Sequence, residues 1–320
     1  MRIKKFIIIL LLTSSVVFGF EKVGTTSFQF LKVMTTARAY ALAGAYTTVA
    51  NTSDAVFWNP AGLTQIKHFG VSAGYTEWIM DIGHYSFSGA YTVEGVGTFA
   101  AFAMFNDIGE IQETQVSALG FVNGKYNPGL TGRTFSPSSM VAGISFARDL
   151  NDRFTFGINV KYAREDLVYE SAGVIAFDGG LIYNTGFKSI ILGATIRNFG
   201  PEVEFIDRSY PLPQTLTLGL STMLFSRYDP LLMNLGAHSL LVTYAMEQPR
   251  DYDQQHIIGM EYGFDEMLYL RGGYRFNGDQ EGLSFGGGVL FHGYKIDYAF
   301  SDFGEHLSSV HRISLGINVN

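Results

Sequence analysis

The chain has 320 residues, of which 47% are hydrophobic, 15% aromatic and only 16% charged. Soluble domains carry about 25% charged residues, so much of this surface is expected to face something other than water. The formal net charge of −7 gives no electrostatic support for a nucleic-acid partner, and the lack of cysteine excludes disulfides, thiolate metal sites and a lipid anchor on cysteine.

The N-terminus predicts an export signal. Residues 2–5 carry three basic side chains, residues 6–12 are apolar, and Val17-Phe18-Gly19 offers a small-residue cleavage site. The apolar stretch is shorter than the roughly 20 residues of a helix that crosses a bilayer. We therefore expect residues 1–19 to be a signal peptide and the mature chain to start near Phe20, outside the inner membrane.

The next segment, residues 20–67, is rich in alanine and predicts short helices and turns. Within it, Asn59 can cap a helix, Pro60 suits the first helical position, and Gly62 can end the turn early. The segment is too small to fold alone, so we expect a plug inside the barrel or across one of its mouths. Trp58, beside this turn, is open to two interpretations, a buried anchor of the plug or a ligand contact.

From Phe69 onward, apolar and polar residues alternate in runs of about ten. This period indicates strands with one face in an apolar medium, and ten residues let a tilted strand cross the hydrocarbon layer. After residue 12 no apolar run approaches a spanning helix. Residues 68–320 therefore predict an all-β fold, a 14-stranded antiparallel transmembrane β-barrel. The expected strands are 69–79, 83–93, 96–105, 139–149, 153–163, 174–185, 189–198, 214–225, 238–247, 255–265, 267–277, 282–292, 293–301 and 310–319.

The connections differ in length. Some are tight, as at Gly95 and Gly293, whereas residues 106–138, 165–173, 200–213 and 226–237 are long. Such an alternation is typical of a barrel with turns at one mouth and loops at the other.

The alternation also assigns faces. Phe154, Ile296 and Leu315 belong to sets expected to face lipid, and the residues between them should face the lumen. Charged residues then expected in the lumen are Lys161, Asp178, Arg197, Glu247, Glu261, Arg271, Arg275, Lys295, Asp297 and Arg312. If a turn centres on Glu266, Glu261 and Arg271 lie opposite each other. The mixed signs predict a paired network around a plug and disfavour a wide ion-selective porin.

No pattern predicts catalysis. His84 and Ser86 share a strand face, as in outer-membrane phospholipases, but Phe87 and Ser88 follow where those enzymes need asparagine and glycine. Two polar lumen residues are the favoured interpretation. Gly286-Gly287-Gly288 lies in a strand and predicts either close packing against the plug or a bend of the strand. We expect no enzyme activity, no cofactor and no metal site.

Residues 37–50 (ARAYALAGAYTTVA) and 54–63 (DAVFWNPAGL) resemble the start of the PorV/PorQ family, which belongs to the FadL-like outer-membrane barrels. Looser similarities follow at residues 198–201, 211–213, 259–274 and 311–315. The resemblance implies a fourteen-stranded barrel whose N-terminal segment sits in the lumen as a hatch. Six residues of this block are the tentative plug or ligand site: Arg38, Gly44, Trp58, Asn59, Pro60 and Gly62.

Two functions follow from the resemblance, and both place the chain in the lipid of the bacterial outer membrane. PorV and PorQ serve type IX secretion, which implies an envelope component that binds secretion-system or cargo proteins, with residues 106–138 as the expected contact. FadL-like transporters move a hatch to pass hydrophobic substrates, which implies passive uptake of a small hydrophobic ligand gated by residues 38–63. The chain departs from many such barrels by ending in Asn320 without a terminal aromatic residue.

Overall fold

The computed structural model describes residues 23–278, 282–301 and 309–319, so the predicted signal peptide lies outside the described residues. Among the described residues, no helix is long and apolar enough to cross a bilayer. The helical elements are η1 (Gln29–Lys32), α2 (Ala37–Ala41), η2 (Ser53–Phe57), η3 (Pro60–Gln65) and η4 (Ile79–Asp81), all of them 3-10 turns except α2.

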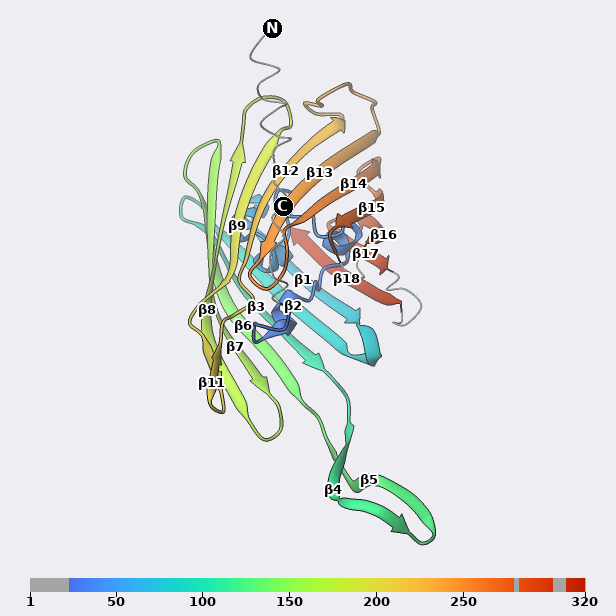
Figure 1. The fold of residues 1–320 in the computed structure, drawn as a ribbon. Coiled ribbons are helices and arrows are strands. Elements are labelled where there is room, and N and C mark those ends of the chain that lie inside the picture. The colour runs from blue at the N-terminus through green and yellow to red at the C-terminus, as the bar shows by residue number, and fades with distance from the viewer. Residues whose placement is uncertain (1–22, 279–281, 302–308, 320) are drawn as a thin grey trace, which may run out of the picture.

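Fourteen antiparallel strands form a closed barrel (Figure 1). They are β1 (Phe69–Glu77), β2 (Gly83–Val93), β3 (Gly97–Asp107), β6 (Ser138–Asp149), β7 (Phe154–Asp166), β8 (Ser171–Asn184), β9 (Ile191–Phe199), β12 (Thr215–Phe225), β13 (His238–Pro249), β14 (Gln255–Phe264), β15 (Leu268–Phe276), β16 (Leu283–Phe291), β17 (Tyr294–Ser301) and β18 (Val310–Val319). The barrel closes where β1 pairs with β18, from Phe69 opposite Val319 to Glu77 opposite His311. The predicted strand number and antiparallel order are confirmed.

Two hairpins were not predicted. Residues expected to form loops contain β4 (Ile111–Val122) paired with β5 (Lys125–Phe135), and β10 (Val203–Phe205) paired with β11 (Arg208–Tyr210). The β4–β5 hairpin projects well beyond the barrel (Figure 1). Most of its residues are exposed on both faces, so its sequence lacks the alternation that marks a half-buried strand.

The expected separation of short turns and long loops is partly wrong. The short connections 94–96, 150–153, 265–267 and 292–293 lie at one mouth, which we call the turn end. Both unpredicted hairpins lie at the other mouth, the hairpin end. The long connection 226–237 lies at the turn end, because β12 runs toward that mouth. The length of a connection therefore does not predict the mouth at which it lies.

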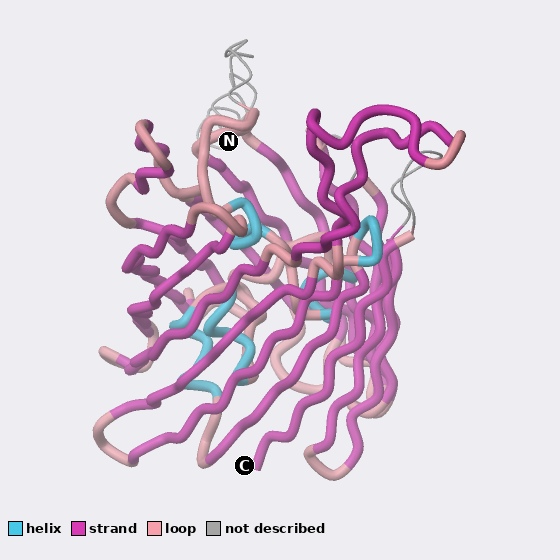
Figure 2. The backbone as a smooth tube through the Cα atoms, turned by 90° about the horizontal axis from the view of Figure 1, so that it is seen from below, coloured by secondary structure: helices cyan, strands magenta, loops and turns pink. Residues whose placement is uncertain are grey.

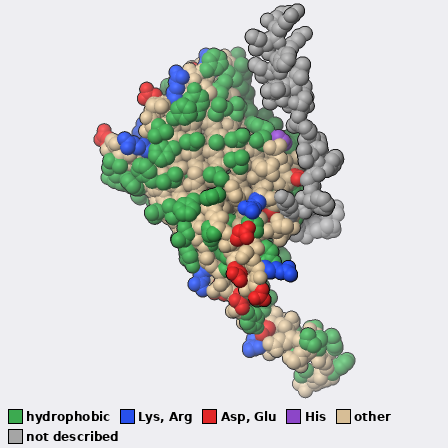
Figure 3. Space-filling view, turned by 60° about the vertical axis from the view of Figure 1, so that its left-hand side comes forward, with side chains coloured by type: hydrophobic (Ala, Val, Ile, Leu, Met, Phe, Trp, Pro, Cys, Tyr) green, Lys and Arg blue, Asp and Glu red, His purple; other side chains and the backbone are tan. Residues whose placement is uncertain are grey.

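The wall has an apolar outside and a polar inside, as predicted. Phe154, Ile296 and Leu315 are exposed by 43%, 56% and 52%, and all ten charged residues expected in the lumen are at least largely buried. On the face drawn in Figure 3, hydrophobic side chains form a broad band over the wall, and charged side chains gather toward its two ends. An outer surface of exposed Phe, Leu and Ile is stable only against an apolar phase, as a bilayer provides.

The N-terminal part of the chain runs inside the barrel (Figure 2). We call residues 25–66 the luminal segment. Its residues from Thr35 to Leu63 are almost all buried, with η3 against β6, β7 and β8, and α2 against β15, β16 and β17. Its only α-helix has five residues, so it is mostly turns and extended chain. Many of its backbone amides and carbonyls therefore need hydrogen-bond partners outside the segment.

The turn predicted at Asn59 is confirmed in part. The Asn59 side chain accepts a hydrogen bond from the Ala61 amide at 3.1 Å, and Pro60 opens η3. The expectation that Gly62 ends this turn was wrong, because η3 continues to Gln65. Glycine is needed there for space, since a β-carbon would lie 2.0 Å from the Ala50 carbonyl oxygen.

A single carboxylate anchors the base of the β4–β5 hairpin. Glu113 accepts hydrogen bonds from the hydroxyls of Thr131 at 2.6 Å and Tyr169 at 2.9 Å, and its oxygens bind the Arg133 guanidinium at 2.6 and 3.0 Å. Tyr169 belongs to the connection between β7 and β8, so Glu113 joins the hairpin to the barrel. Hydrogen bonds from Thr131, Tyr169 and Arg133 lower the pKa of Glu113 to about 2. The clamp is therefore complete above the ordinary glutamate pKa and is lost only as the pH falls toward 2.

We predict that Glu113→Gln loosens the hairpin at neutral pH, because a neutral amide cannot replace the charged acceptor. Amide hydrogen exchange over residues 111–135 should become about tenfold faster. Glu110→Gln, an exposed neighbour outside the clamp, should leave the exchange unchanged. Equal exchange in both variants would contradict the clamp.

Candidate functional site: the lumen and the segment that fills it

A belt of small residues lines the inside of the wall where the luminal segment packs. On neighbouring strands the belt residues pair directly, with Gly157 opposite Gly180, Gly193 opposite Gly219, and Gly259 opposite Gly273. A β-carbon would lie 2.3 Å from Pro60 at Gly157, and 2.4 Å from Leu42 at Gly273, in both cases against backbone. Only glycine lets the two backbones approach this closely.

This belt was missed at the sequence level, although its signal was present. Each of these glycines occupies a lumen-facing position of its strand, where a barrel usually places a polar side chain. The prediction for the triple glycine is confirmed at Gly286, where a β-carbon would lie 2.5 Å from the Ala41 side chain. Gly44, in the luminal segment, has a φ of +95° and leaves room for Arg275.

Polar side chains of the wall bind backbone carbonyls of the luminal segment. Arg312 Nε donates to Met34 O at 2.9 Å, and Arg275 Nη2 donates to Ala43 O at 2.9 Å. Three more such bonds run from Thr243 to Ala45 O, from Asn159 to Val56 O and from Arg197 to Phe57 O. These donors take the place of secondary structure, because a buried carbonyl without a partner is costly. Their spacing along the chain fixes the segment over most of its length.

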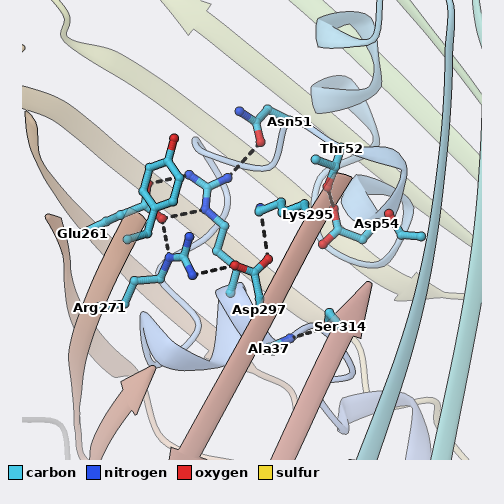
Figure 4. Close-up of polar contacts among 12 residues, drawn as sticks. Ala37, Asn51, Thr52, Asp54, Glu261, Arg271, Lys295, Asp297 and Ser314 are labelled. Carbon is cyan, nitrogen blue, oxygen red and sulfur yellow. Dashed lines mark hydrogen bonds and ion pairs between the residues drawn. The ribbon is translucent and has the colours of Figure 1, made fainter. Parts of the chain in front are cut away.

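The predicted network of lumen charges is present and centres on Glu261. Glu261 binds Arg38 through two bonds, Nε–Oε2 at 2.7 Å and Nη2–Oε1 at 2.9 Å, and also pairs with Arg271 on β15. The cross-strand register of Glu261 and Arg271 is as predicted. Arg271 continues to Asp297 at 2.7 Å, and Asp297 pairs with Lys295 (Figure 4). Arg38 thus ties the luminal segment to three strands.

The remaining lumen charges form two further groups. Lys161 pairs with Asp178 at 2.7 Å on the neighbouring strand. Arg197 and Arg275 both bind Glu247, at 3.2 and 3.4 Å. Each of the three groups contains charges of both signs, so the interior is a set of paired networks and not a one-sign filter.

Two aromatic contacts also hold the luminal segment in place. The Trp58 indole is buried, donates to Thr36 Oγ1 at 3.1 Å, and packs edge-on against Tyr46 at 5.7 Å. This favours the anchor interpretation of Trp58. The Arg312 guanidinium lies 3.2 Å from the centre of the Tyr40 ring, a close cation–π contact.

A series of cavities remains between the two mouths. A mostly apolar pocket of about 540 Å³ at the hairpin end is lined by Leu31, Met34 and Trp78, and also by the charged side chains of Arg197, Glu247 and Arg275. A narrow cavity of about 40 Å³ follows beside Met34 and Trp58. A chamber of about 400 Å³ comes next, against β1, β2 and β18, and a vestibule of about 950 Å³ opens at the turn end.

Successive cavities share lining residues, so they lie along one route. Met34 lines the first two, Phe57 lines the second and the third, and Arg38 lines the chamber and the vestibule. The 40 Å³ cavity is the smallest of the four, and residues 31–35 line it. His84 and Ser86 face the lumen as polar residues, and the described residues contain no cluster of three or more potential metal ligands.

Solved structures share this fold. The Pseudomonas putida toluene transporter TodX aligns with a TM-score of 0.58 at 13% identity, over 88% of this chain and 98% of TodX. The monoaromatic hydrocarbon channel CymD gives 0.56 at 13% identity, over 89% and 98%. A Pseudomonas aeruginosa FadL homologue gives 0.53 at 12% identity, over 90% and 99%. The chain therefore has the fold of the FadL-like barrels.

No family model matches the sequence, and no curated protein matches it. The PorV/PorQ resemblance of the N-terminal block accordingly stays a prediction.

We predict that Gly273→Val displaces the luminal segment, because its β-carbon would meet Leu42 backbone that cannot move aside locally. Overpacking of this kind costs about 1–3 kcal/mol. The conductance of the purified protein in planar bilayers should rise. Gly272→Val is the matched control, since the nearest atom to a β-carbon there lies 3.7 Å away on Phe285. If folded Gly273→Val has the conductance of the wild type, the close packing of the luminal segment against Gly273 does not hold that segment in place.

We also predict that Glu261→Leu loosens the segment more than Arg38→Met does. The first change leaves Arg38 buried without its carboxylate, at a cost of about 3–5 kcal/mol, whereas the second leaves Glu261 paired with Arg271. Ser53, which is fully buried, can report this as a single cysteine in a chain that has no other. Labelling of Ser53→Cys by an impermeant maleimide should be fastest with Glu261→Leu, and the reverse order would exclude this role.

Proposed function

We propose that this protein is an outer-membrane channel for passive uptake of small hydrophobic compounds, with the luminal segment as its gate. The observation that carries the proposal is the series of adjoining cavities, which begins in a mostly apolar pocket at the hairpin end and is smallest beside residues 31–35. An apolar pocket at the mouth of a barrel is where a ligand of that kind partitions first.

The fold supports the same function. TodX is a toluene transporter and CymD is a monoaromatic hydrocarbon channel, and both align over nearly their whole length. An apolar wall behind an expected export signal supports the outer membrane as the location, with lipid as the surrounding partner.

The gate is the stretch of the luminal segment beside the smallest cavity. Residues 33–36 lie outside regular structure, between η1 and α2. Around them, the wall supplies the bond from Arg312 to Met34 O, and Ala37 N donates to Ser314 Oγ at 2.8 Å. Each such bond contributes about 0.5–1.5 kcal/mol net, so a shift of this stretch costs far less than removal of the whole segment.

The secretion role expected from the N-terminal block gains no support from the comparisons. The β4–β5 hairpin, where that contact was expected, projects from the hairpin end with Phe121 and Tyr126 exposed. A secretion role would leave the cavity route without a purpose, so transport accounts for more of the structure.

A reversible lock tests the proposal. Ala37, next to the gate, donates its amide to Ser314 Oγ of β18 at 2.8 Å, so the two residues lie close enough for cysteines at both positions to form a disulfide that holds the gate to the wall. Oxidation of this double variant should reduce uptake of labelled toluene to the level of cells without the protein, and reduction should restore it.

The matched controls are Ala37→Cys and Ser314→Cys alone, which cannot form the bridge and should take up toluene at the same rate with and without oxidant. Full uptake by the oxidised double variant would remove the luminal segment as a gate. Uptake at the background level in every variant, wild type included, would remove the transport function itself.

A further inference from the structure

The chamber in the route is polar, unlike the pocket that leads to it. Neighbouring strands β2, β1 and β18 place Ser86, Ser88, Ser72 and Ser314 on its wall. Ser72 lies directly opposite Ser88 in the β1–β2 register. The wall carries these serine hydroxyls on β1, β2 and β18. The strands on the opposite side of the barrel carry the belt of small residues instead. The luminal segment fills the belt side and leaves a chamber on the serine side.

The luminal segment faces the serines with hydrogen-bonding groups of its own. Asn51, Thr52 and Asp54 line the chamber, and Lys295 and Asp297 enter from β17 (Figure 4). Asp54 is only 7% exposed, accepts a bond from Thr52 Oγ1, and has no ion-pair partner within the described ranges. Its carboxylate is a buried acceptor beside open space. Phe57 and Leu290 line the same chamber and offer apolar surface.

We infer that the chamber binds the hydroxyl group of a small amphiphilic solute, so the channel prefers an alcohol or a phenol over the bare hydrocarbon of the same skeleton. This inference rests on the proposed transport function and names its substrate class. The apolar pocket at the hairpin end takes the body of such a solute. The chamber then offers its hydroxyl both acceptors, such as Asp54, and donors, such as the serines and Lys295.

The preference follows from desolvation. A hydrocarbon that enters the chamber displaces water from serine hydroxyls and from Asp54 and returns no hydrogen bond. A solute of the same skeleton with one hydroxyl replaces at least one of those bonds. A site built around polar groups rejects the analogue that lacks the partner, because its own groups are left unpaired.

Toluene and benzyl alcohol, which share a skeleton and differ by one hydroxyl, test the inference. Uptake of each labelled compound is measured in cells that make the protein and in cells that do not, and the difference is compared. We expect the protein-dependent uptake of benzyl alcohol to exceed that of toluene by about threefold to tenfold, the value of one hydrogen bond.

Variants at Asp54 locate the effect. Asp54→Leu should lower the ratio of benzyl alcohol uptake to toluene uptake to about one, and Asp54→Asn, which keeps one acceptor oxygen, should restore part of the preference. Asp207→Asn, on the exposed turn between β10 and β11, is the matched control and should behave as wild type. If Asp54→Leu does not fold, Ser86→Ala provides a second removal of a chamber hydroxyl.

The outcomes separate the two proposals. Toluene uptake equal to or above that of benzyl alcohol would overturn the inference and leave the channel standing. An equal loss of both compounds in Asp54→Leu would show that the chamber only supports the structure, and would also overturn it. No protein-dependent uptake of either compound would overturn the proposed function, and the inference with it.

Discussion

The wall holds the luminal segment by its backbone. A segment with one short α-helix cannot satisfy its own carbonyls, and in the middle of a barrel those carbonyls must find partners on the wall. Arg312 and Arg275 supply two of them, and the glycines at positions 157 and 273 let the two backbones come close enough. The position of the luminal segment against these glycines decides which part of the lumen is filled. It also leaves the chamber open on the side of the serines.

The ion pairs orient the segment more than they stabilise it. Burial of charges costs free energy that their attraction often only offsets, so a buried pair contributes little net stability while the loss of one member is expensive. Glu261 illustrates this, because it satisfies two guanidiniums at once, one on the luminal segment and one on the wall. Such a network specifies one position for the segment, and the stretch 33–36, which lies outside regular structure, is the proposed place where it can shift.

The route changes character along its length, and this gradient connects structure to transport. Its first pocket is apolar at Leu31 and Trp78, its chamber is lined by hydroxyls and charges, and its vestibule opens at the turn end. A molecule with an apolar body and a hydroxyl meets a favourable surface at both stages. TodX and CymD are named for hydrocarbons, so the polarity of this chamber is the feature by which the present chain would differ from a plain hydrocarbon channel.

Alternation along residues 69–319 was sufficient to predict fourteen strands, the lipid-facing side of residues such as Phe154 and Leu315, and the ring of charges inside, including the pair of Glu261 and Arg271. The turn at Asn59 was also readable, because capping is a local interaction. These features depend on neighbours in sequence or on one adjacent strand.

By itself, then, the sequence determined the barrel, its two faces and its inward charges, since a period of two and a membrane-length strand are local properties. Only the tertiary structure decided which wall residues bind the carbonyls of the luminal segment, which connection lies at which mouth, and that Ser72, Ser86 and Asp54 share a chamber. Those relations join positions far apart in the chain across the lumen, and no local pattern encodes a distance between them.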